Sequence, residues 1–305
     1  MAKTKQFKTY SQQVELLRSR GMQIDDSENA ARMLAQLNYY RLSGYWYPMR
    51  KFDPITNNAM DEFVPGTTFD RVLSLYKFDE KLRHVIFAEL DRIEMAFRTM
   101  LGYELGKIDP LIHLSTDRLG AAAIQEKRSG TTPHEIWLCK YKSLLKSSKE
   151  DFVAHHNAKY DGALPIWAAV EIMDWGMLSH LYGMSPQCVR KNIASLANLS
   201  GPQLESWMRT LNVLRNYVAH HARMFNRVYS LKPKLSRDSS LLEIANGMNR
   251  LFGQLSLIQY LHRKLELSPA TRLPQILKQY PENDIVPFSR TGAPANWQQL
   301  DLWLC

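Results

Sequence analysis

The chain has 305 residues, of which 45% are hydrophobic, and its 39 Lys and Arg outnumber its 30 Asp and Glu to give a net charge of +9. The apolar share is enough for a folded core, and the positive charge favours an anionic partner such as nucleic acid. No apolar stretch reaches the roughly 18 residues of a membrane-spanning helix, and no apolar segment follows the charged start as in a secretory signal. We therefore expect a cytoplasmic protein without a membrane partner.

The hydrophobic spacing predicts one helix after another. We expect helices near residues 10–20, 26–37, 69–106, 134–148, 150–160, 166–183, 186–198, 203–228 and 239–266. Residues 51–67 contain Pro, Asn and Gly and indicate a loop with room for a small hairpin. The predicted class is all-α, with an N-terminal helical subdomain over 1–62, a helical bundle over 63–268 and a C-terminal extension over 269–305.

An aromatic segment follows the second predicted helix, and residues 38–48 read NYYRLSGYWYP. Its rings could stack on bases while Arg41 holds a phosphate. They could also form a packed turn that fixes the N-terminal helices. Gly44 and Pro48 mark a shaped turn, so we favour packing for the rings, and Arg41 stays a candidate RNA-binding residue.

The sequence predicts no metal site and no cofactor. Cys139, Cys188 and Cys305 stand far apart and form neither a CxxC pair nor a zinc-binding spacing, as expected for reduced thiols. His155 and His156 are adjacent, but no third ligand stands at metal spacing from them.

The predicted helix over 203–228 has two unlike faces when drawn at about 100° per residue. One arc is apolar and faces a core, with Leu211, Leu214, Val218, Ala222 and Phe225. The opposite arc carries Arg209, Asn212, Asn216, His220, Arg223 and Arg227. Residues 209–237 contain seven Lys or Arg and no acid. Such a face favours phosphate, so we expect Arg209, Arg223 and Arg227 to bind RNA.

The same wheel separates two adjacent histidines. His220 lies on the polar arc beside Asn216, whereas His221 points into the apolar arc near Tyr217. We interpret His221 as a packed, hydrogen-bonded structural histidine, although a role in orienting His220 or contacting a partner subunit stays open. Arg215 lies at the edge of the polar arc, and its long side chain can reach over Asn216. The candidate catalytic residues are therefore Arg215, Asn216 and His220, supported by Tyr217 and His221.

These residue types suit RNA cleavage. The RNA 2′-hydroxyl can attack its own adjacent phosphorus, so the protein needs only to move protons and stabilise negative charge. Histidine transfers protons near neutral pH, and arginine donates two parallel hydrogen bonds to phosphate oxygens. A single Arg–His pair does not supply both a general base and a general acid, whereas two copies across a twofold axis would. The chemistry thus predicts a homodimer.

The spacing of Arg215 and His220 is no proof, because an Arg followed by four to six residues and a His also arises by chance. A noncatalytic module that holds a small structured RNA or a partner protein remains the alternative. A helix-turn-helix DNA binder over residues 10–40 is weaker, because nothing there resembles a base-contacting recognition helix.

Four segments together resemble a known family. They are residues 211–227 (LNVLRNYVAHHARMFNR), 38–48, 164–179 (LPIWAAVEIMDWGMLS) and the pattern FDxxLRxxIxxxLxxIE over 78–94. They resemble the signatures of the Abi-like (AbiD/AbiF) bacterial abortive-infection proteins, over about residues 10–265.

The resemblance implies a HEPN-type helical domain and phage defence through RNA cleavage. In HEPN ribonucleases the Arg and His of the motif act in a paired, usually metal-independent active site. Carried over, these are Arg215 and His220, with Asn216 in the variable polar position. One convincing motif in the chain implies a homodimer. The partners implied are substrate RNA and, for some of these proteins, a small structured noncoding RNA.

Two pairs of charged residues remain outside this motif. Glu94 and Arg98 stand four residues apart on a predicted helix, where a salt bridge is favoured over a catalytic carboxylate. Glu171 and Asp174 precede Trp175 and could line the site, but a solvated or capping role is favoured.

Overall fold

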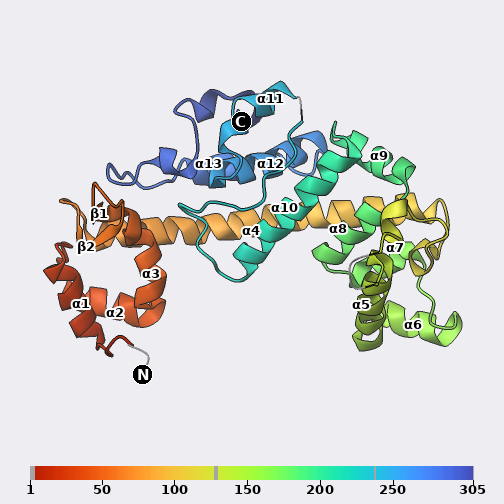
Figure 1. Ribbon diagram of the computed structural model, residues 1–305, viewed down its shortest axis with the longest axis horizontal. Helices are drawn as coiled ribbons and strands as arrows, with labels where there is room; N and C mark the ends of the chain where they lie inside the picture. Colours follow the sequence, from red (N-terminus) through yellow and green to blue (C-terminus); the bar gives the residue numbers. More distant parts are fainter. Residues whose placement is uncertain (1–3, 127–129, 237, 305) are drawn as a thin grey trace.

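The computed structural model describes residues 4–126, 130–236 and 238–304. Within these ranges the chain is mostly helical, with one small antiparallel sheet, so the predicted all-α class is confirmed (Figure 1). The α-helices are α1 (Tyr10–Ser19), α2 (Ser27–Leu37), α3 (Tyr39–Trp46), α4 (Phe69–Gly106), α5 (Pro133–Ser147), α6 (Asp151–Lys159), α7 (Ile166–Ala169), α8 (Trp175–Met184), α9 (Gln187–Leu196), α10 (Gly201–Ala219), α11 (Ser239–Leu242), α12 (Leu251–Lys264) and α13 (Arg272–Leu277). The strands are β1 (Arg50–Phe52) and β2 (Ala59–Phe63).

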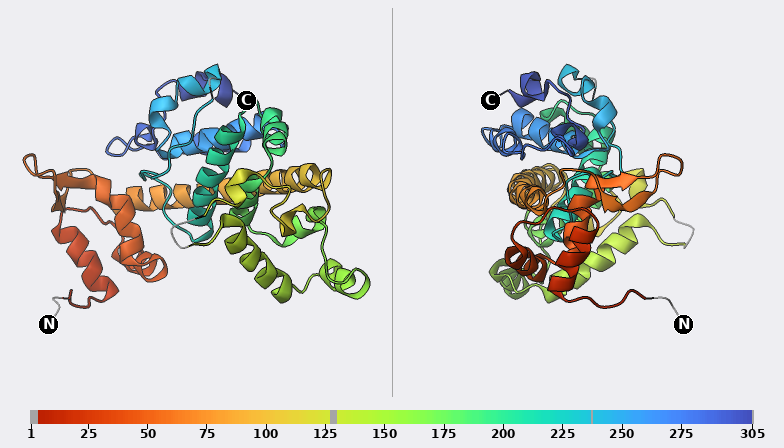
Figure 2. Two further views of the ribbon diagram at one scale, coloured as in Figure 1. Left: turned by 45° about the vertical axis from the view of Figure 1, so that its right-hand side comes forward. Right: turned by 90° about the vertical axis from the view of Figure 1, so that its left-hand side faces the viewer.

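Helix α4 has 38 residues and is the longest helix in the described part of the chain. The Thr68 side chain caps it by accepting the N–H of Arg71 at 3.1 Å, and the apolar spacing then continues without Gly or Pro as far as Gly102. This helix confirms the sequence prediction over 69–106. Figures 1 and 2 show it running through the molecule, with the other elements attached along its length.

The N-terminal lobe has its own apolar core. Helices α1–α3 and the β1–β2 hairpin pack on the first two turns of α4 around the buried side chains of Leu34, Trp46 and Val72. Asp26 caps α2 by accepting the N–H of Asn29 at 2.9 Å. The aromatic segment is a helix, α3, rather than a turn, and its rings pack only in part: Tyr45 and Trp46 are buried, whereas Tyr40 and Tyr47 are exposed.

The main core gathers around the rest of α4. Helices α7–α10 and α12 contribute to it, and residues from the C-terminal region over 269–305 join it, including the buried Leu273, Trp297 and Trp303. Helices α5 and α6 form a second lobe, which projects from α4 on the same side as the N-terminal lobe, while α11–α13 lie on the opposite side (Figure 1).

Three predicted helices end or break earlier than expected. The helix predicted over 166–183 divides into α7 and α8, because the Asp174 side chain starts a new helix by accepting the N–H of Met177 at 2.8 Å. The helix predicted over 239–266 divides into α11 and α12, with a turn around Gly247 between them. The helix predicted over 203–228 ends at Ala219.

No helix in the described part of the chain is long and apolar enough to cross a bilayer. Cys139 and Cys188 are free and exposed, and Cys305 lies outside the described residues.

Candidate active site

Helix α10 carries Arg215 and Asn216 of the predicted motif, and hydrogen bonds to neighbouring segments hold it in place. The Ser200 N–H donates to the Gln203 side chain at 2.8 Å at the start of the helix. The Trp175 indole donates to the Met208 carbonyl at 2.9 Å, which ties α10 to α8. The Trp207 indole donates to the Lys234 carbonyl at 2.8 Å, which connects α10 to the segment between α10 and α11. The last two turns of α10, with Arg215, are thereby laid across α4 (Figure 1).

The chain leaves the helix directly after Ala219. His220 is the C-cap residue, and His221 has a left-handed φ of 54°, so the helical wheel no longer applies beyond this point. The prediction that His221 packs into the core is therefore wrong, and its side chain is exposed. Phe225 is buried as predicted, but in the core of the N-terminal lobe.

A buried carboxylate holds the loop that follows α10. Asp79 of α4 is fully buried and accepts the backbone N–H of Phe225 at 2.8 Å and that of Met224 at 3.2 Å. It also accepts hydrogen bonds from the Tyr45 hydroxyl and from Arg83, each at 2.6 Å. Although burial lowers the pKa of Arg83, the ion pair with Asp79 and the nearby Tyr45 hydroxyl raise it on balance, so Arg83 stays charged. These four donors compensate the cost of burying the carboxylate.

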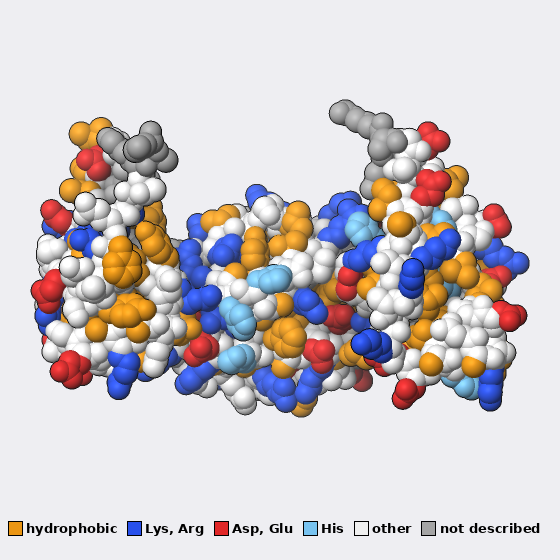
Figure 3. All heavy atoms as spheres, turned by 90° about the horizontal axis from the view of Figure 1, so that it is seen from below, with side chains coloured by type: hydrophobic (Ala, Val, Ile, Leu, Met, Phe, Trp, Pro, Cys, Tyr) orange, Lys and Arg blue, Asp and Glu red, His pale blue; other side chains and the backbone are white. Residues whose placement is uncertain are grey.

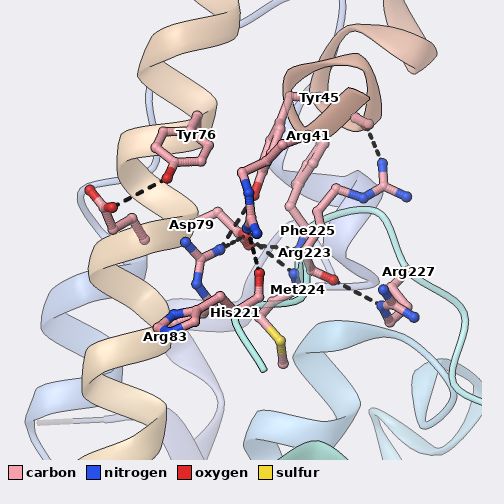
Figure 4. Close-up of polar contacts among 12 residues, drawn as sticks. Arg41, Tyr45, Tyr76, Asp79, Arg83, His221, Arg223, Met224, Phe225 and Arg227 are labelled. Atoms are coloured by element: carbon pink, nitrogen blue, oxygen red, sulfur yellow. Dashed lines mark hydrogen bonds and ion pairs between the residues drawn. The ribbon is translucent and has the colours of Figure 1, made fainter. Parts of the chain in front are cut away.

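Helix α3 holds the same loop from the other side. Arg41 donates to the backbone carbonyl of His221 at 2.7 Å, and Arg223 donates to the carbonyl of Gly44. A Cβ at Gly44 would stand 3.2 Å from the Arg223 side chain, so the absence of a side chain at Gly44 permits this close approach. Figure 4 shows Arg41 reaching from α3 to the backbone carbonyl of His221, beside the contact between Asp79 and Arg83 of α4.

A hollow of about 570 Å³ opens at this junction. Its wall comes from α3, α4, the end of α10 and the loop after it. The lining residues are Arg41, Tyr76, Glu80, Arg83, His84, Phe87, Arg215, Val218, Ala219 and His221. Three arginines and two histidines face one glutamate here, so the hollow suits an anionic ligand such as a phosphodiester.

Arg215 reaches the hollow from α10, and it interacts with two carboxylates, those of Glu94 and Asp174. Its Nε lies 4.0 Å from Glu94 Oε2, and 38% of its side chain is exposed. Glu94 also pairs with Arg98 at 3.0 Å, as the sequence predicted. Although burial raises the pKa of Asp174, hydrogen bonds from Lys140 and the Met177 N–H lower it on balance, and Arg215 adds to the lowering. The capping role predicted for Asp174 is confirmed.

The structure separates the three candidate catalytic residues. Arg215 lines the hollow together with His221. Asn216 and His220 are exposed near the end of α10 but do not line it. The histidine that shares a cavity with Arg215 is thus His221. Five residues separate Arg215 from His221, so this pair also has the four-to-six-residue spacing of the motif.

The four candidate RNA-binding arginines all have protein partners. Arg41 and Arg223 hold α3 against the loop, as described above. Arg227 donates to the Arg223 carbonyl at 2.8 Å, and its guanidinium lies 4.3 Å from the centre of the Tyr217 ring. Arg209 pairs with Glu205 at 2.7 Å, and 58% of its side chain remains exposed. Tyr217 is half-buried and packs against Tyr229.

Sequence reasoning missed the part of the hollow that α4 provides. Asp79, Arg83 and His84 come from α4 and stand far from the motif in the chain. One signal was present: Asp79 falls between Tyr76 and Leu82 on the apolar face of a long helix, where an acid is rare unless it is paired. No comparable signal marked His84, which lies on the solvent face of α4.

Figure 3 shows the face that contains this region. Histidine side chains gather in the middle of this face, with Lys and Arg, hydrophobic and a few acidic side chains around them, and the two lobes rise on either side. In the described ranges, no three His, Cys, Asp or Glu side chains are grouped so that they could hold a metal ion.

The chain belongs to the Abi-like protein family, whose profile matches residues 32–226. The match begins in α2 and ends just after Phe225, so it contains α3, the whole of α4 and α10, and the lining of the hollow. The family suggests a role in abortive infection, a defence against phage, and it is compatible with an enzyme. Comparisons with curated proteins and with solved structures found no significant match.

Proposed function

We propose that this protein is a HEPN-type, metal-independent endoribonuclease, a toxin of phage defence, and that the hollow is its reaction site. The observation that carries the proposal is the shared cavity of Arg215 and His221, which brings a permanent cation and an imidazole to one place. The surrounding Arg41 and Arg83 add positive charge for the RNA backbone.

The proposed reaction is an internal transesterification. A base takes the proton of the 2′-hydroxyl, O2′ attacks the adjacent phosphorus, and the bond between phosphorus and O5′ breaks. An acid gives a proton to O5′, and the products end in a 2′,3′-cyclic phosphate and a 5′-hydroxyl. Arg215 stabilises the phosphorane oxygens and His221 transfers one proton. Such a proton transfer contributes about 10²–10⁴-fold to the rate, and no external nucleophile is needed.

We also propose that the active form is a homodimer. The described chain carries one motif, and Asn216 and His220 are exposed at the end of α10, where a second subunit or the RNA could meet them. In this assignment Asn216 and His220 contribute to substrate or subunit contacts, and His221 acts within the hollow. Analytical ultracentrifugation of the purified protein tests the assembly, and a monomer at all concentrations would contradict it.

The experiment that tests the site compares His221→Ala with His220→Ala on cellular RNA. Cleavage should fall by about 10²-fold or more in His221→Ala, and by less in His220→Ala. The opposite order would show that the residue beside Asn216 is the proton-transfer group and that the hollow is not the reaction site. Val228→Ala changes an exposed side chain in the loop after α10, outside the hollow lining, and provides the matched control for a general disturbance there.

A noncatalytic RNA-binding module is the second candidate. The Lys and Arg that lie near the histidines in Figure 3 support it, because such side chains bind the phosphate backbone without any chemistry. In that case Arg215→Ala would weaken RNA binding, the affinity would fall steeply with salt, and the wild-type protein would leave RNA intact.

A further inference from the structure

A second histidine faces the hollow from an element outside the motif. His84 lies on the solvent face of α4, is exposed, and lines the hollow together with Arg215 and His221. It follows Arg83, whose guanidinium is fixed by Asp79 at 2.6 Å, and precedes Phe87 by one turn. His84, Arg215 and His221 therefore reach one cavity from α4, from α10 and from the loop after α10.

The chemistry proposed above needs two proton transfers, one from O2′ and one to O5′. A single histidine in the cavity leaves one of them without a partner. We propose that His84 is the second proton-transfer group, so that the hollow of one subunit contains a complete acid and base pair. This inference rests on the proposed function, and it replaces the second subunit as the source of the missing proton donor or acceptor.

The balance of the step requires the two histidines to begin in opposite protonation states. The neutral imidazole accepts the proton of the 2′-hydroxyl as O2′ bonds to phosphorus. The protonated one donates its proton to O5′ as the bond between phosphorus and O5′ breaks. The two histidines then exchange protons with water and return to their starting states.

The charged surroundings of His84 agree with this assignment. The groups that face the hollow with it are Glu80 and Arg83 from α4, Arg41 from α3, Arg215 from α10 and His221. Glu80 accepts the hydroxyl of Tyr76 at 3.3 Å. Arg83 is paired with Asp79 and Arg41 is bound to a carbonyl, so neither guanidinium is positioned as a proton carrier. The two imidazoles are the lining side chains best suited to transfer protons.

A chemically modified substrate separates the two roles. In an RNA with sulfur in place of the scissile O5′, the leaving thiolate needs no proton, so loss of the general acid no longer slows cleavage. We would measure His84→Gln and His221→Gln on the normal and the 5′-thio RNA across pH 5 to 9, in EDTA, with binding of an uncleavable 2′-O-methyl RNA measured alongside. His155→Gln on α6 is the matched control, since His155 is exposed and far from the hollow lining.

We expect both variants to lose about 10²-fold or more on normal RNA while binding is retained. One of the two should recover on 5′-thio RNA, each should lose one limb of a bell-shaped pH profile, and His155→Gln should match the wild type. Wild-type rates for His84→Gln, or a loss explained by weaker binding, would overturn the inference and leave the proposed ribonuclease intact. If the wild type cleaves neither RNA, the proposed function itself fails.

Mixing the two variants tests whether the pair acts within one subunit. An equimolar mixture of His84→Gln and His221→Gln should stay as slow as either variant alone. If mixing restores cleavage, the two histidines act across a subunit interface, and the single-subunit pair is wrong.

Discussion

The carboxylate of Asp79 on the long helix α4 accepts the backbone N–H of Phe225 at 2.8 Å. Phe225 lies 146 residues further along the chain. The same carboxylate binds the N-terminal lobe through the Tyr45 hydroxyl at 2.6 Å. Three segments that lie far apart in the sequence thus meet at one buried anion. Its position fixes the path of the chain directly after Arg215 and His221, and it therefore shapes the hollow.

Replacing Asp79 with Ala should lower the free energy of unfolding, so that the variant unfolds at a lower urea concentration than the wild type. The change leaves Arg83 buried without its counter-ion and removes the acceptor of two backbone N–H groups. The expected loss is about 3–5 kcal/mol of unfolding free energy, measured by urea denaturation. Hydrogen exchange at Met224 and Phe225 should accelerate in the same variant.

Asp61→Ala is the control for this prediction. Asp61 pairs with Arg20 at 2.8 Å, but 67% of its side chain is exposed, so its loss should cost no more than about 1 kcal/mol. Equal stability of the two variants would show that Asp79 does not anchor the loop.

Replacing Arg41 with Ala should affect cleavage more than stability. Arg41 is exposed and makes one hydrogen bond to the His221 carbonyl at 2.7 Å, so the loss of unfolding free energy should be about 1 kcal/mol. The backbone of His221 would then shift, and misplacing a reacting group costs roughly 10²-fold in rate. Arg32→Ala, which removes an exposed arginine of α2, should change neither property. If RNA cleavage by Arg41→Ala stays at the wild-type rate, Arg41 does not position His221.

The stability of the protein should fall as the pH is lowered below 6.5. His113 is fully buried, and burial followed by the nearby His134 lowers its pKa from 6.5 to about 4. Between these values the unfolded chain binds the proton and the folded protein does not. The stabilisation is therefore complete above pH 6.5 and is lost on the way down to pH 4, by roughly 3 kcal/mol.

His113→Phe tests this pH dependence. A phenyl ring fits the aromatic contacts with Trp137 and Tyr141 and does not titrate. The slope of the unfolding free energy against pH should be smaller in this variant between pH 6.5 and 4. An unchanged slope would assign the acid sensitivity to other groups, such as His262, whose pKa burial also lowers.

Much of the fold could be predicted from the sequence because its signals are local. The start of α4 depends on Thr68, and its length depends on unbroken apolar spacing, both of which are readable in one segment. The salt bridge of Glu94 with Arg98 depends on their spacing within the same helix. The motif of Arg215 and His220 is readable in one segment for the same reason, and its catalytic role stays a prediction.

The end of α10 could not be predicted, because nothing near Ala219 signals a stop. The chain turns at His221 since Asp79 and Arg41 bind the backbone that follows α10, and both come from distant elements. The predicted helical wheel therefore placed His221 in the core and Arg223 on the solvent face. The hollow likewise depends on how α4 crosses α10, so His84 carried no signal in the sequence.

The most direct measurement is the end-group analysis of RNA incubated in EDTA with wild-type protein, with Arg215→Ala and with His221→Ala. The account predicts wild-type products that end in 2′,3′-cyclic phosphate and 5′-hydroxyl, and a loss of about 10²-fold or more in each variant. Intact RNA with the wild type, products with 3′-hydroxyl ends, or equal cleavage by all three proteins would contradict it.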